Sequence, residues 1–332
     1  MKKLDKLDRR ILSELDHDSR QSISDIARRL RQGRDRVGYR VDQLTEREII
    51  LGFTTSMNIY RLGYTIFKSY LRLESSRESS QALITYLRSH PRVYWYALCD
   101  GGWDLMIAVF ARNAREFHLI HSEIVTRFND IVLNFSMYTL IELHLYRMGF
   151  LLGKKTDHFL IGGELGTETI DQQDYQILKI LSDDSRKGLA QIATQIHSTP
   201  AVVKYRIARL ERQGIISGYT IEPNLEKLDM MFFKAQLFLR NYTSTLREEF
   251  REFCQQNPYI SCYIEQLGDA TLEIELQVHD YEQFNEIIDE IRASFSKLVR
   301  NFQTVLIRQA RFNWLPRDLV MKDKSPRKLN MA

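Results

Sequence analysis

The sequence predicts an α+β fold that is built twice in one chain, each copy being a small helical domain followed by a domain of strands and helices. Three observations predict it: an internal repeat, a helical spacing of apolar residues in the first part of each copy, and a β-α-β-β-α-β order in the second part. The length of 332 residues agrees with more than one domain.

The composition is that of an ordinary soluble protein, with 44% hydrophobic and 27% charged residues. No run of about eighteen apolar residues is present, and the N-terminus lacks the apolar core of a signal peptide, so we expect no membrane segment. Cys99, Cys254 and Cys262 show no paired spacing. This argues against disulfides and zinc, and we therefore expect a cytoplasmic protein without metal or cofactor. The net charge of +4 is too small to indicate a nucleic-acid partner by itself.

The internal repeat keeps one register through the first part of each copy. Asp18-Ser19-Arg20 meets Asp184-Ser185-Arg186 at an offset of 166 residues, and Phe67-Lys68 still meets Phe233-Lys234. Other pairs at this offset are Asp5/Asp171, Asp8/Asp174, Ile11/Ile177, Leu12/Leu178, Val37/Val203, Tyr39/Tyr205, Arg40/Arg206 and Leu44/Leu210. After one extra residue, Pro91 meets Pro258 and Phe117 meets Phe284. Coincidental similarity between amphipathic helices does not hold a register this long, so the chain is a tandem duplication.

The repeat and the intervening glycines predict six segments. They are a helical domain at 1–60, a mixed domain at 61–148, a linker at 149–169, a second helical domain at 170–226, a second mixed domain at 227–315 and a basic tail at 316–332. Gly162, Gly163 and Gly166 act as breakers in the linker. We expect the tail to be mobile, because it is polar and terminal.

The first part of each copy shows three short amphipathic helices. In the second copy the third helix begins with Thr199 as N-cap and Pro200 at the first helical position. Its apolar stripe is Val203, Ile207 and Leu210, matched by Val37, Val41 and Leu44 in the first copy. The segment after this helix in each copy alternates and gives a short strand pair, which is the expected wing. Helix, helix, turn, helix and wing is the pattern of a winged helix-turn-helix.

The exposed face of the third helix is where DNA contact is expected. The candidate residues are Arg31, Arg34, Asp35, Arg36, Tyr39, Arg40 and Gln43 in the first copy, and Thr199, Val202, Lys204, Tyr205, Arg206 and Arg209 in the second. Arginine can bind guanine edges bidentately and can also bind phosphate. A charge run alone indicates a solvated surface, but its place in a helix-turn-helix pattern that occurs twice favours DNA contact. We predict that replacing Arg34, Arg36 and Arg40 together with alanine abolishes binding without unfolding the protein.

The second part of each copy predicts a ferredoxin-like domain. Apolar strands at 64–73 and 232–240 are followed by an amphipathic helix, two strands joined at a glycine-containing turn, another helix and a closing strand. One face of such a sheet carries both helices. The other face must therefore be covered by a second sheet.

These features together resemble the Lrp/AsnC family of feast/famine transcriptional regulators. The matching residues are the start of the chain (Leu4, Asp5, Asp8, Ile11, Leu12), the Asp-Ser-Arg turn, the segment Thr199–Thr220 and the Gly101-Gly102-Trp103-Asp104 turn. The resemblance implies a winged-helix domain that binds double-stranded DNA and a ferredoxin-like module that dimerises and senses small molecules, often amino acids. With two units in one chain, it also implies an intramolecular pseudo-dimer and a homo-oligomer.

The resemblance further implies an effector site near the glycine-containing turns. In this chain the residues are Gly101, Gly102, Trp103 and Asp104 in the first copy, and Gly268 and Asp269 in the second. Thr271 stands where Asp104 does, so we expect the second site to be altered or lost. Glycine at a hairpin turn also has a purely structural explanation.

The sequence is compatible with two alternative functions. Siroheme decarboxylases have a similar plan, but the histidines of the two mixed domains fall at unlike positions, and we therefore expect no enzyme and no catalytic residues. The other alternative is an adaptor that pairs with single-unit relatives without binding DNA, because the third helix of the second copy is less basic.

Overall fold

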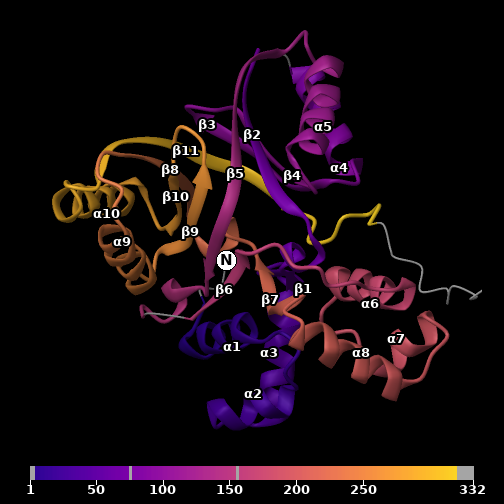
Figure 1. Ribbon diagram of the computed structural model, residues 1–332. Coiled ribbons are helices and arrows are strands. Elements are labelled where there is room, and N and C mark those ends of the chain that lie inside the picture. Colours follow the sequence, from indigo (N-terminus) through magenta and orange to yellow (C-terminus); the bar gives the residue numbers. More distant parts are fainter. Residues whose placement is uncertain (1–3, 75–76, 155–156, 320–332) are drawn as a thin grey trace, which may run out of the picture.

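Two winged-helix domains lie side by side at one end of the molecule, and a β-barrel lies at the other (Figure 1). The computed structural model describes residues 4–74, 77–154 and 157–319. The first winged-helix domain contains α1 (Lys6–His17), α2 (Ile23–Leu30), α3 (Arg34–Glu46) and β1 (Ile50–Met57). The second contains α6 (Gln172–Asp183), α7 (Leu189–Gln195), α8 (Pro200–Arg212) and β7 (Ile216–Pro223).

Both winged-helix domains start with the same capping box. Asp5 and Asp8 exchange side-chain and backbone hydrogen bonds at the start of α1, and Asp171 and Asp174 do so at the start of α6. A capping box satisfies amide groups that have no partner within the helix. The repeated Asp-x-x-Asp spacing therefore fixes where each domain begins.

The wing differs from the expected strand pair within each copy. Each copy contributes one strand, and β1 pairs antiparallel with β7 across the two copies, with Thr54 opposite Thr220. These residues differ by the repeat offset, so the ribbon is centred on a pseudo-twofold axis. Each strand also packs on the other copy: Ile221 is buried in the first winged-helix core, and the Thr55 hydroxyl donates to the Leu181 carbonyl at 2.6 Å.

The first mixed domain has the predicted ferredoxin-like order. It consists of β2 (Thr65–Leu73), α4 (Arg77–Ser89), β3 (Val93–Gly101), β4 (Leu105–Ala111), α5 (Ala114–Arg127) and β5 (Val132–Tyr146). The second repeats it as β8 (Met231–Leu239), α9 (Ser244–Gln256), β9 (Ile260–Leu267), β10 (Leu272–Val278), α10 (Tyr281–Ser294) and β11 (Val299–Phe312). The 3-10 turns η1 (Ile59–Leu62) and η3 (Glu226–Leu228) join the winged-helix domains to the sheets.

The two sheets close into one barrel. Their strand orders are β5-β2-β4-β3 and β11-β8-β10-β9, and they join edge to edge through the pairs β3–β11 and β9–β5. The helices lie outside, so the faces that the sequence left uncovered become the barrel interior. Closure removes the free edges that an open sheet would expose. The expected intramolecular pseudo-dimer is therefore present.

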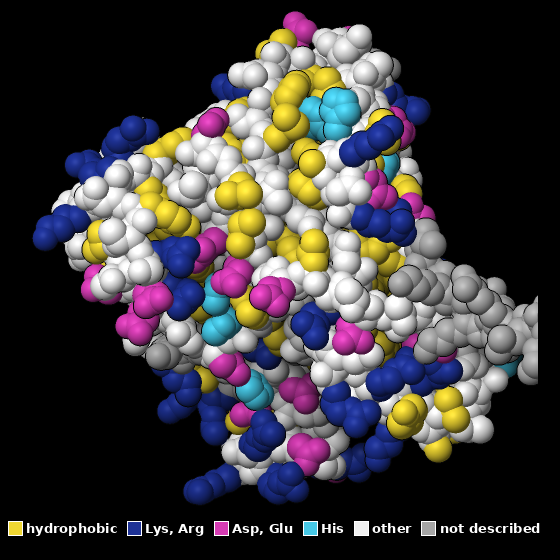
Figure 2. Space-filling model, in the orientation of Figure 1, with side chains coloured by type: hydrophobic (Ala, Val, Ile, Leu, Met, Phe, Trp, Pro, Cys, Tyr) yellow, Lys and Arg dark blue, Asp and Glu magenta, His cyan; other side chains and the backbone are white. Residues whose placement is uncertain are grey.

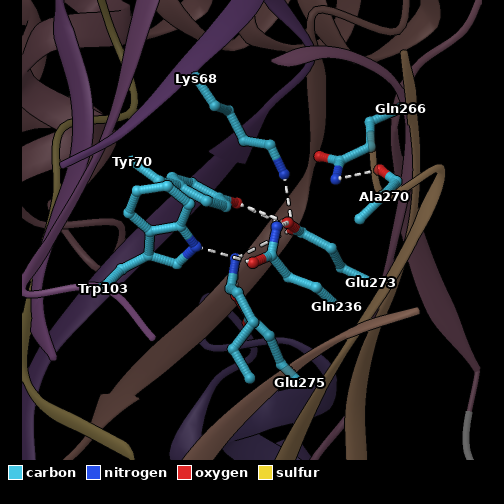
Figure 3. A network of polar contacts seen from close by, with 9 residues as sticks. Lys68, Tyr70, Trp103, Gln236, Gln266, Ala270, Glu273 and Glu275 are labelled. Carbon is cyan, nitrogen blue, oxygen red and sulfur yellow. Dashed lines mark hydrogen bonds and ion pairs between the residues drawn. The ribbon is translucent and has the colours of Figure 1, made fainter. Parts of the chain in front are cut away.

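The barrel interior is polar at its centre. Lys68, Tyr70, Gln236 and Glu273 are buried there and hydrogen-bonded to one another around the Glu273 carboxylate (Figure 3). Trp103 comes from the β3–β4 turn and donates its indole N–H to Gln236 at 2.9 Å. Toward the winged-helix domains the barrel opens into a cavity of about 1280 Å³. We call this space the barrel-mouth cavity.

The segment between the copies is more ordered than a plain linker. It contains η2 (Gly149–Leu151) and β6 (His158–Gly162), which pairs with β5. Phe159 and Ile161 alternate with exposed residues and are buried, which is the pattern of a strand packed on one side. The predicted tail packs as far as Leu319, with Asp318 paired to Arg92, while residues 320–332 lie outside the described residues. No helix in the described ranges is long and apolar enough to cross a membrane.

Candidate nucleic-acid interface

The third helices of the two winged-helix domains, α3 and α8, both lie at the end of the molecule opposite the barrel (Figure 1). Tyr39 on α3 and Tyr205 on α8 occupy matching positions, and each is 63% exposed. A single exposed tyrosine is common on a protein surface, but here the same residue is exposed at the same position of both third helices. Figure 2 shows Lys and Arg side chains along the same end of the molecule.

Arg40 makes a contact that the sequence did not indicate. Its guanidinium donates to the carboxylates of Asp5 at 2.8 Å and Asp8 at 2.9 Å, and the Asp8 side chain is buried. Hydrogen bonds from the Asp8 amide and then from Arg40 lower the pKa of Asp5. Arg40 therefore ties α3 to the start of α1, and the proposed triple alanine variant would also remove a structural ion pair.

The second copy repeats this contact between the third helix and the start of the first helix, which we call the arginine clamp, and adds a second arginine to it. Arg206 donates to Asp171 at 2.9 Å and to Asp174 at 2.7 Å, and Arg209 also donates to Asp174. Arg209 corresponds to Gln43, which instead donates to Glu46 on its own helix at 2.7 Å. Two arginines therefore hold α8 to α6, whereas one holds α3 to α1.

The first copy keeps several cations free for a ligand. Arg31, Arg34 and Arg36 are exposed, and among the described residues no acidic side chain pairs with them; Asp35 is exposed beside them. Arg28 and Arg29, by contrast, pair with Asp25 at 2.6 Å and Glu14 at 3.2 Å. The turn before α3 and its first turn thus form the more cationic surface of the two domains.

The second copy presents a smaller and more apolar surface. Thr199 caps α8 by accepting the Val202 amide at 3.3 Å, and Val202 itself is 39% exposed. Lys204 is exposed and has no acidic partner in the part of the chain that the structure describes. Among the described candidate residues, Lys204 is the free cation of this surface, whereas the first surface has Arg31, Arg34 and Arg36.

The repeated Asp-Ser-Arg turn joins the two winged-helix domains, a role that its sequence did not reveal. The Ser19 and Ser185 hydroxyls hydrogen-bond to each other at 2.6 Å, and Arg186 donates to the Ser19 carbonyl at 2.7 Å. Arg20 donates in the same way to the Ser185 carbonyl. A polar trio repeated without change at the offset of the duplication was the available signal.

The predicted effector residues lie in two turns that pack between the copies. A Cβ atom on Gly102 would lie 2.0 Å from the Gln303 side chain, and one on Gly268 would lie 2.2 Å from the Tyr138 ring. Gly268, which also has a positive φ of 148°, is therefore required by the contact between the two sheets, whereas at Gly102 the flexible end of Gln303 would have to move. Gly101, also in close contact with β11, has a positive φ of 125°.

The other predicted effector residues have separate surroundings. Asp104 accepts the Leu73 amide at 2.9 Å, Trp103 is buried in the barrel, and Asp269 is exposed. None of the six residues predicted for the effector lines the barrel-mouth cavity. The turns and the cavity are thus different places in the molecule.

Comparison with known proteins identifies both winged-helix domains. A family model described as winged helix-turn-helix DNA-binding matches residues 4–50 and residues 170–217. An uncharacterized HTH-type transcriptional regulator from Pyrococcus horikoshii is 36% identical over 115 residues, which is 34% of this chain and 77% of the relative. The HTH-type transcriptional regulator LysM of Saccharolobus solfataricus is 28% identical over 144 residues, 43% of this chain and 98% of the relative. LrpB of Bacillus subtilis, another such regulator, is 29% identical over 122 residues, 37% of this chain and 80% of the relative.

A solved structure shares the architecture of the whole chain. The siroheme decarboxylase NirDL superposes with a TM-score of 0.62 at 10% identity, covering 92% of each chain. Its complex with an iron-uroporphyrin III analogue gives a TM-score of 0.63 at 10% identity and covers 94% of each chain. At this identity the likeness shows the tandem fold alone. Given the two matches to the DNA-binding model and the regulators related to it, the chain belongs to the Lrp/AsnC family of HTH-type transcriptional regulators, as a tandem duplication of the family unit.

Proposed function

We propose that this regulator recognises specific sequences in double-stranded DNA through α3 and α8, and that it acts in the cytoplasm. The observation that carries the proposal is the pair of exposed tyrosines, Tyr39 and Tyr205, at matching positions on two helices at one end of the molecule. The free arginines beside Tyr39 supply charge for phosphate contacts. The alternative of an adaptor that does not bind DNA predicts no use for these cations.

The test is DNA binding by the full chain as a function of salt. Sequences selected from a random duplex library give the specific target, and a scrambled duplex gives the non-specific reference. A regulator that contacts several phosphates loses affinity steeply with salt, by a slope of about −0.9 per phosphate in a log–log plot. Absence of binding at low salt would contradict the regulator and support the adaptor.

An enzyme related to siroheme decarboxylase is the second candidate, because the fold of the whole chain is shared with NirDL. The barrel-mouth cavity has no histidine among its described lining residues, which favours the regulator. Incubating the full chain with siroheme distinguishes the two. An enzyme consumes the tetrapyrrole and changes its absorption spectrum, and a regulator leaves it unchanged.

Self-association of the chain is also part of the proposal. Leu133, Met137 and Ile141 are exposed on the outer side of β5, where Figure 2 shows a group of hydrophobic side chains. In the second copy, the corresponding positions of β11 are occupied by Arg300, Thr304 and Arg308. An apolar surface on β5 that the described part of β11 does not repeat suits a closed pair of chains. Light scattering of the wild type and of Met137→Arg tests this: the wild type should be a pair and the variant a single chain.

The response of this regulator to a small molecule is the remaining part of the proposal. Its support is the sensing module that the family resemblance implies, together with a large cavity between the barrel and the winged-helix domains. Thermal unfolding in the presence of each amino acid is the direct test, since a ligand that binds the folded state raises the unfolding temperature.

A further inference from the structure

The barrel-mouth cavity lies between the barrel and the ribbon that joins the two winged-helix domains. Its inner end is lined by Lys68, Trp95, Ala108, Lys234 and Glu275, and its outer wall includes residues of β1 and β7. Ligand pockets are concave, mostly apolar and lined by a few well-placed polar groups, and mouths of β-barrels are common places for them. At about 1280 Å³ the space is large enough for an organic molecule.

Two lysines mark the inner end of the cavity, one from each copy. Lys68 and Lys234 stand at matching positions of the repeat, and both are almost completely buried. Glu273 accepts from Lys68 at 2.6 Å (Figure 3), and its carboxylate lies 3.4 Å from Lys234. A buried charge is costly unless it is paired, so each ammonium needs carboxylate oxygens close by.

The two lysines differ in what stands across the strand from them. Lys234 is paired in register with Glu275, whose carboxylate lies 2.9 Å from its Nζ. At the corresponding position of the first copy, the residue across from Lys68 is Ala108. Residues paired across neighbouring strands point to the same side of a sheet, so both partners face the cavity. The second copy therefore supplies its own carboxylate, and the first has a methyl group in the same place.

Lys68 consequently has more N–H donors than hydrogen-bond acceptors around it. An ammonium has three N–H donors, and the described residues give Lys68 a single hydrogen-bond acceptor, Glu273. Burial lowers the pKa of Lys68 to about 8, which Glu273 only partly offsets. An anion beside Ala108 would satisfy these donors and restore the pairing that Lys234 already has.

The wall next to this position is aromatic. Trp95 is in register with Ala108, and the Phe312 ring lies 6.1 Å from Trp95. Trp314 stacks on Phe312 at 5.4 Å. Aromatic rings stack well on such a wall. Among the residues lining the cavity, seven are Lys or Arg and five are Asp or Glu, which also favours a ligand with negative charge.

We propose that the barrel-mouth cavity binds an aromatic carboxylate, whose carboxylate group contacts Lys68 beside Ala108 as Glu275 contacts Lys234. The ring of the ligand lies against Trp95 and Phe312. Because β1 and β7 form part of the outer wall of the same cavity, the site and the ribbon that joins the two winged-helix domains share one space. Its role as an effector rests on the proposed function, whereas the binding site itself does not.

The first test is isothermal titration calorimetry of the full chain with 2-naphthoate and with 2-naphthamide. The two probes share the same rings, and only the first carries an anion. We expect 2-naphthoate to bind once per chain and at least tenfold more tightly than 2-naphthamide. Failure of 2-naphthoate to bind, or equal affinity for both probes, would overturn the proposal without any variant being needed.

Two substitutions then test the assigned residues. Lys68→Met removes the cation, and Ala108→Glu provides the carboxylate within the chain; each should weaken 2-naphthoate at least tenfold. Matched controls are Ala108→Ser, which adds a polar atom without charge, and Lys297→Met, which removes an exposed lysine that does not line the cavity; both should bind within about threefold of the wild type. Unchanged binding by Lys68→Met would also overturn the proposal.

DNA affinity measured on the same samples separates this proposal from the proposed function. Saturating 2-naphthoate should change the affinity for selected DNA at least threefold in the wild type and not in Lys68→Met. A chain that binds 2-naphthoate through Lys68 but binds no DNA contradicts the regulator and supports the site. A chain that binds DNA but shows no preference for the anion contradicts the site alone.

Discussion

On the exposed side of α3 stand Arg34 and Arg36, whereas Pro200 and Val202 occupy the same positions of α8. The sides of the two helices that face the protein agree closely: Arg40 and Arg206 each bind the aspartate pair at the start of their own copy, and the same three apolar positions are buried. The duplication has thus kept the contacts that hold each recognition helix in place. It has changed the exposed side of the helix, so the two domains are equivalent as structures and differ on the surface proposed to meet DNA.

The largest effect should come from removing the free arginines of the first copy. Arg34→Ala with Arg36→Ala should lower DNA affinity about a hundredfold, since each contact is worth roughly 1–3 kcal/mol, and should reduce the salt slope by about two. Lys204→Ala in the second copy should cost no more than about tenfold. Fluorescence anisotropy at several salt concentrations measures both. Equal losses of DNA affinity from the two domains would contradict the inference that their exposed surfaces differ.

Removing the arginine clamp should change the free energy of unfolding, and here too the two copies should differ. Arg40→Ala leaves the buried Asp8 without its cation and should lower the free energy of unfolding by about 2 kcal/mol. Arg206→Ala should cost only about 1 kcal/mol, because Arg209 still binds Asp174. Urea unfolding measures both values, with Arg36→Ala as an exposed control expected within about 0.5 kcal/mol of the wild type. A larger loss for Arg206→Ala would contradict the assigned contacts.

The two sheets differ at His144 of β5, because the corresponding residue of β11 in the second copy is Arg311. Burial lowers the pKa of His144 to about 4, with His158 and Arg251 adding to the effect. The folded state therefore favours the neutral ring. The contribution of His144 to the free energy of unfolding is fully present above pH 6.5 and is lost as the pH drops toward 4. His144→Gln should make the decrease in the free energy of unfolding across that pH range smaller by about 1 kcal/mol. An unchanged pH dependence would show that the ring titrates normally.

The smallest effect is expected where the two recognition helices agree. Tyr39→Phe and Tyr205→Phe each remove a hydroxyl that can bind phosphate, and each should weaken DNA binding about two- to fivefold. The losses should be equal, because both side chains are equally exposed at matching positions. Anisotropy with the same duplex tests this, and a loss confined to one variant would show that the two helices do not approach DNA alike.

The sequence was sufficient for the fold because the duplication made each pattern visible twice. The three helices, the ferredoxin-like order and the need for a second sheet over the open face all followed from periodicity and from the repeat. The register of the β1–β7 ribbon did not follow, since a strand pattern does not say which strand it pairs with. The order of the linker was also missed, although Phe159 and Ile161 alternate as a short strand does.

The candidate site was predicted less completely than the fold. Helical spacing placed Tyr39 and Arg36 on an exposed face, but it could not show that Arg40 reaches back to Asp5 and Asp8. Such a contact depends on how α1 and α3 cross, which is a property of the packed domain. Lys68 and Lys234 were visible as a repeated lysine within apolar strands, and only barrel closure brings them together.

The hydrogen bond between Ser19 and Ser185 places two unlike recognition domains around one axis within a single polypeptide. An ordinary dimer of identical subunits reads a palindrome, because its two halves are the same. Here the spacing between half-sites is held by the shared ribbon while each half-site can have its own sequence. The operator of this regulator should therefore be an asymmetric pair of half-sites, and dilution of the protein cannot separate the two domains that bind it.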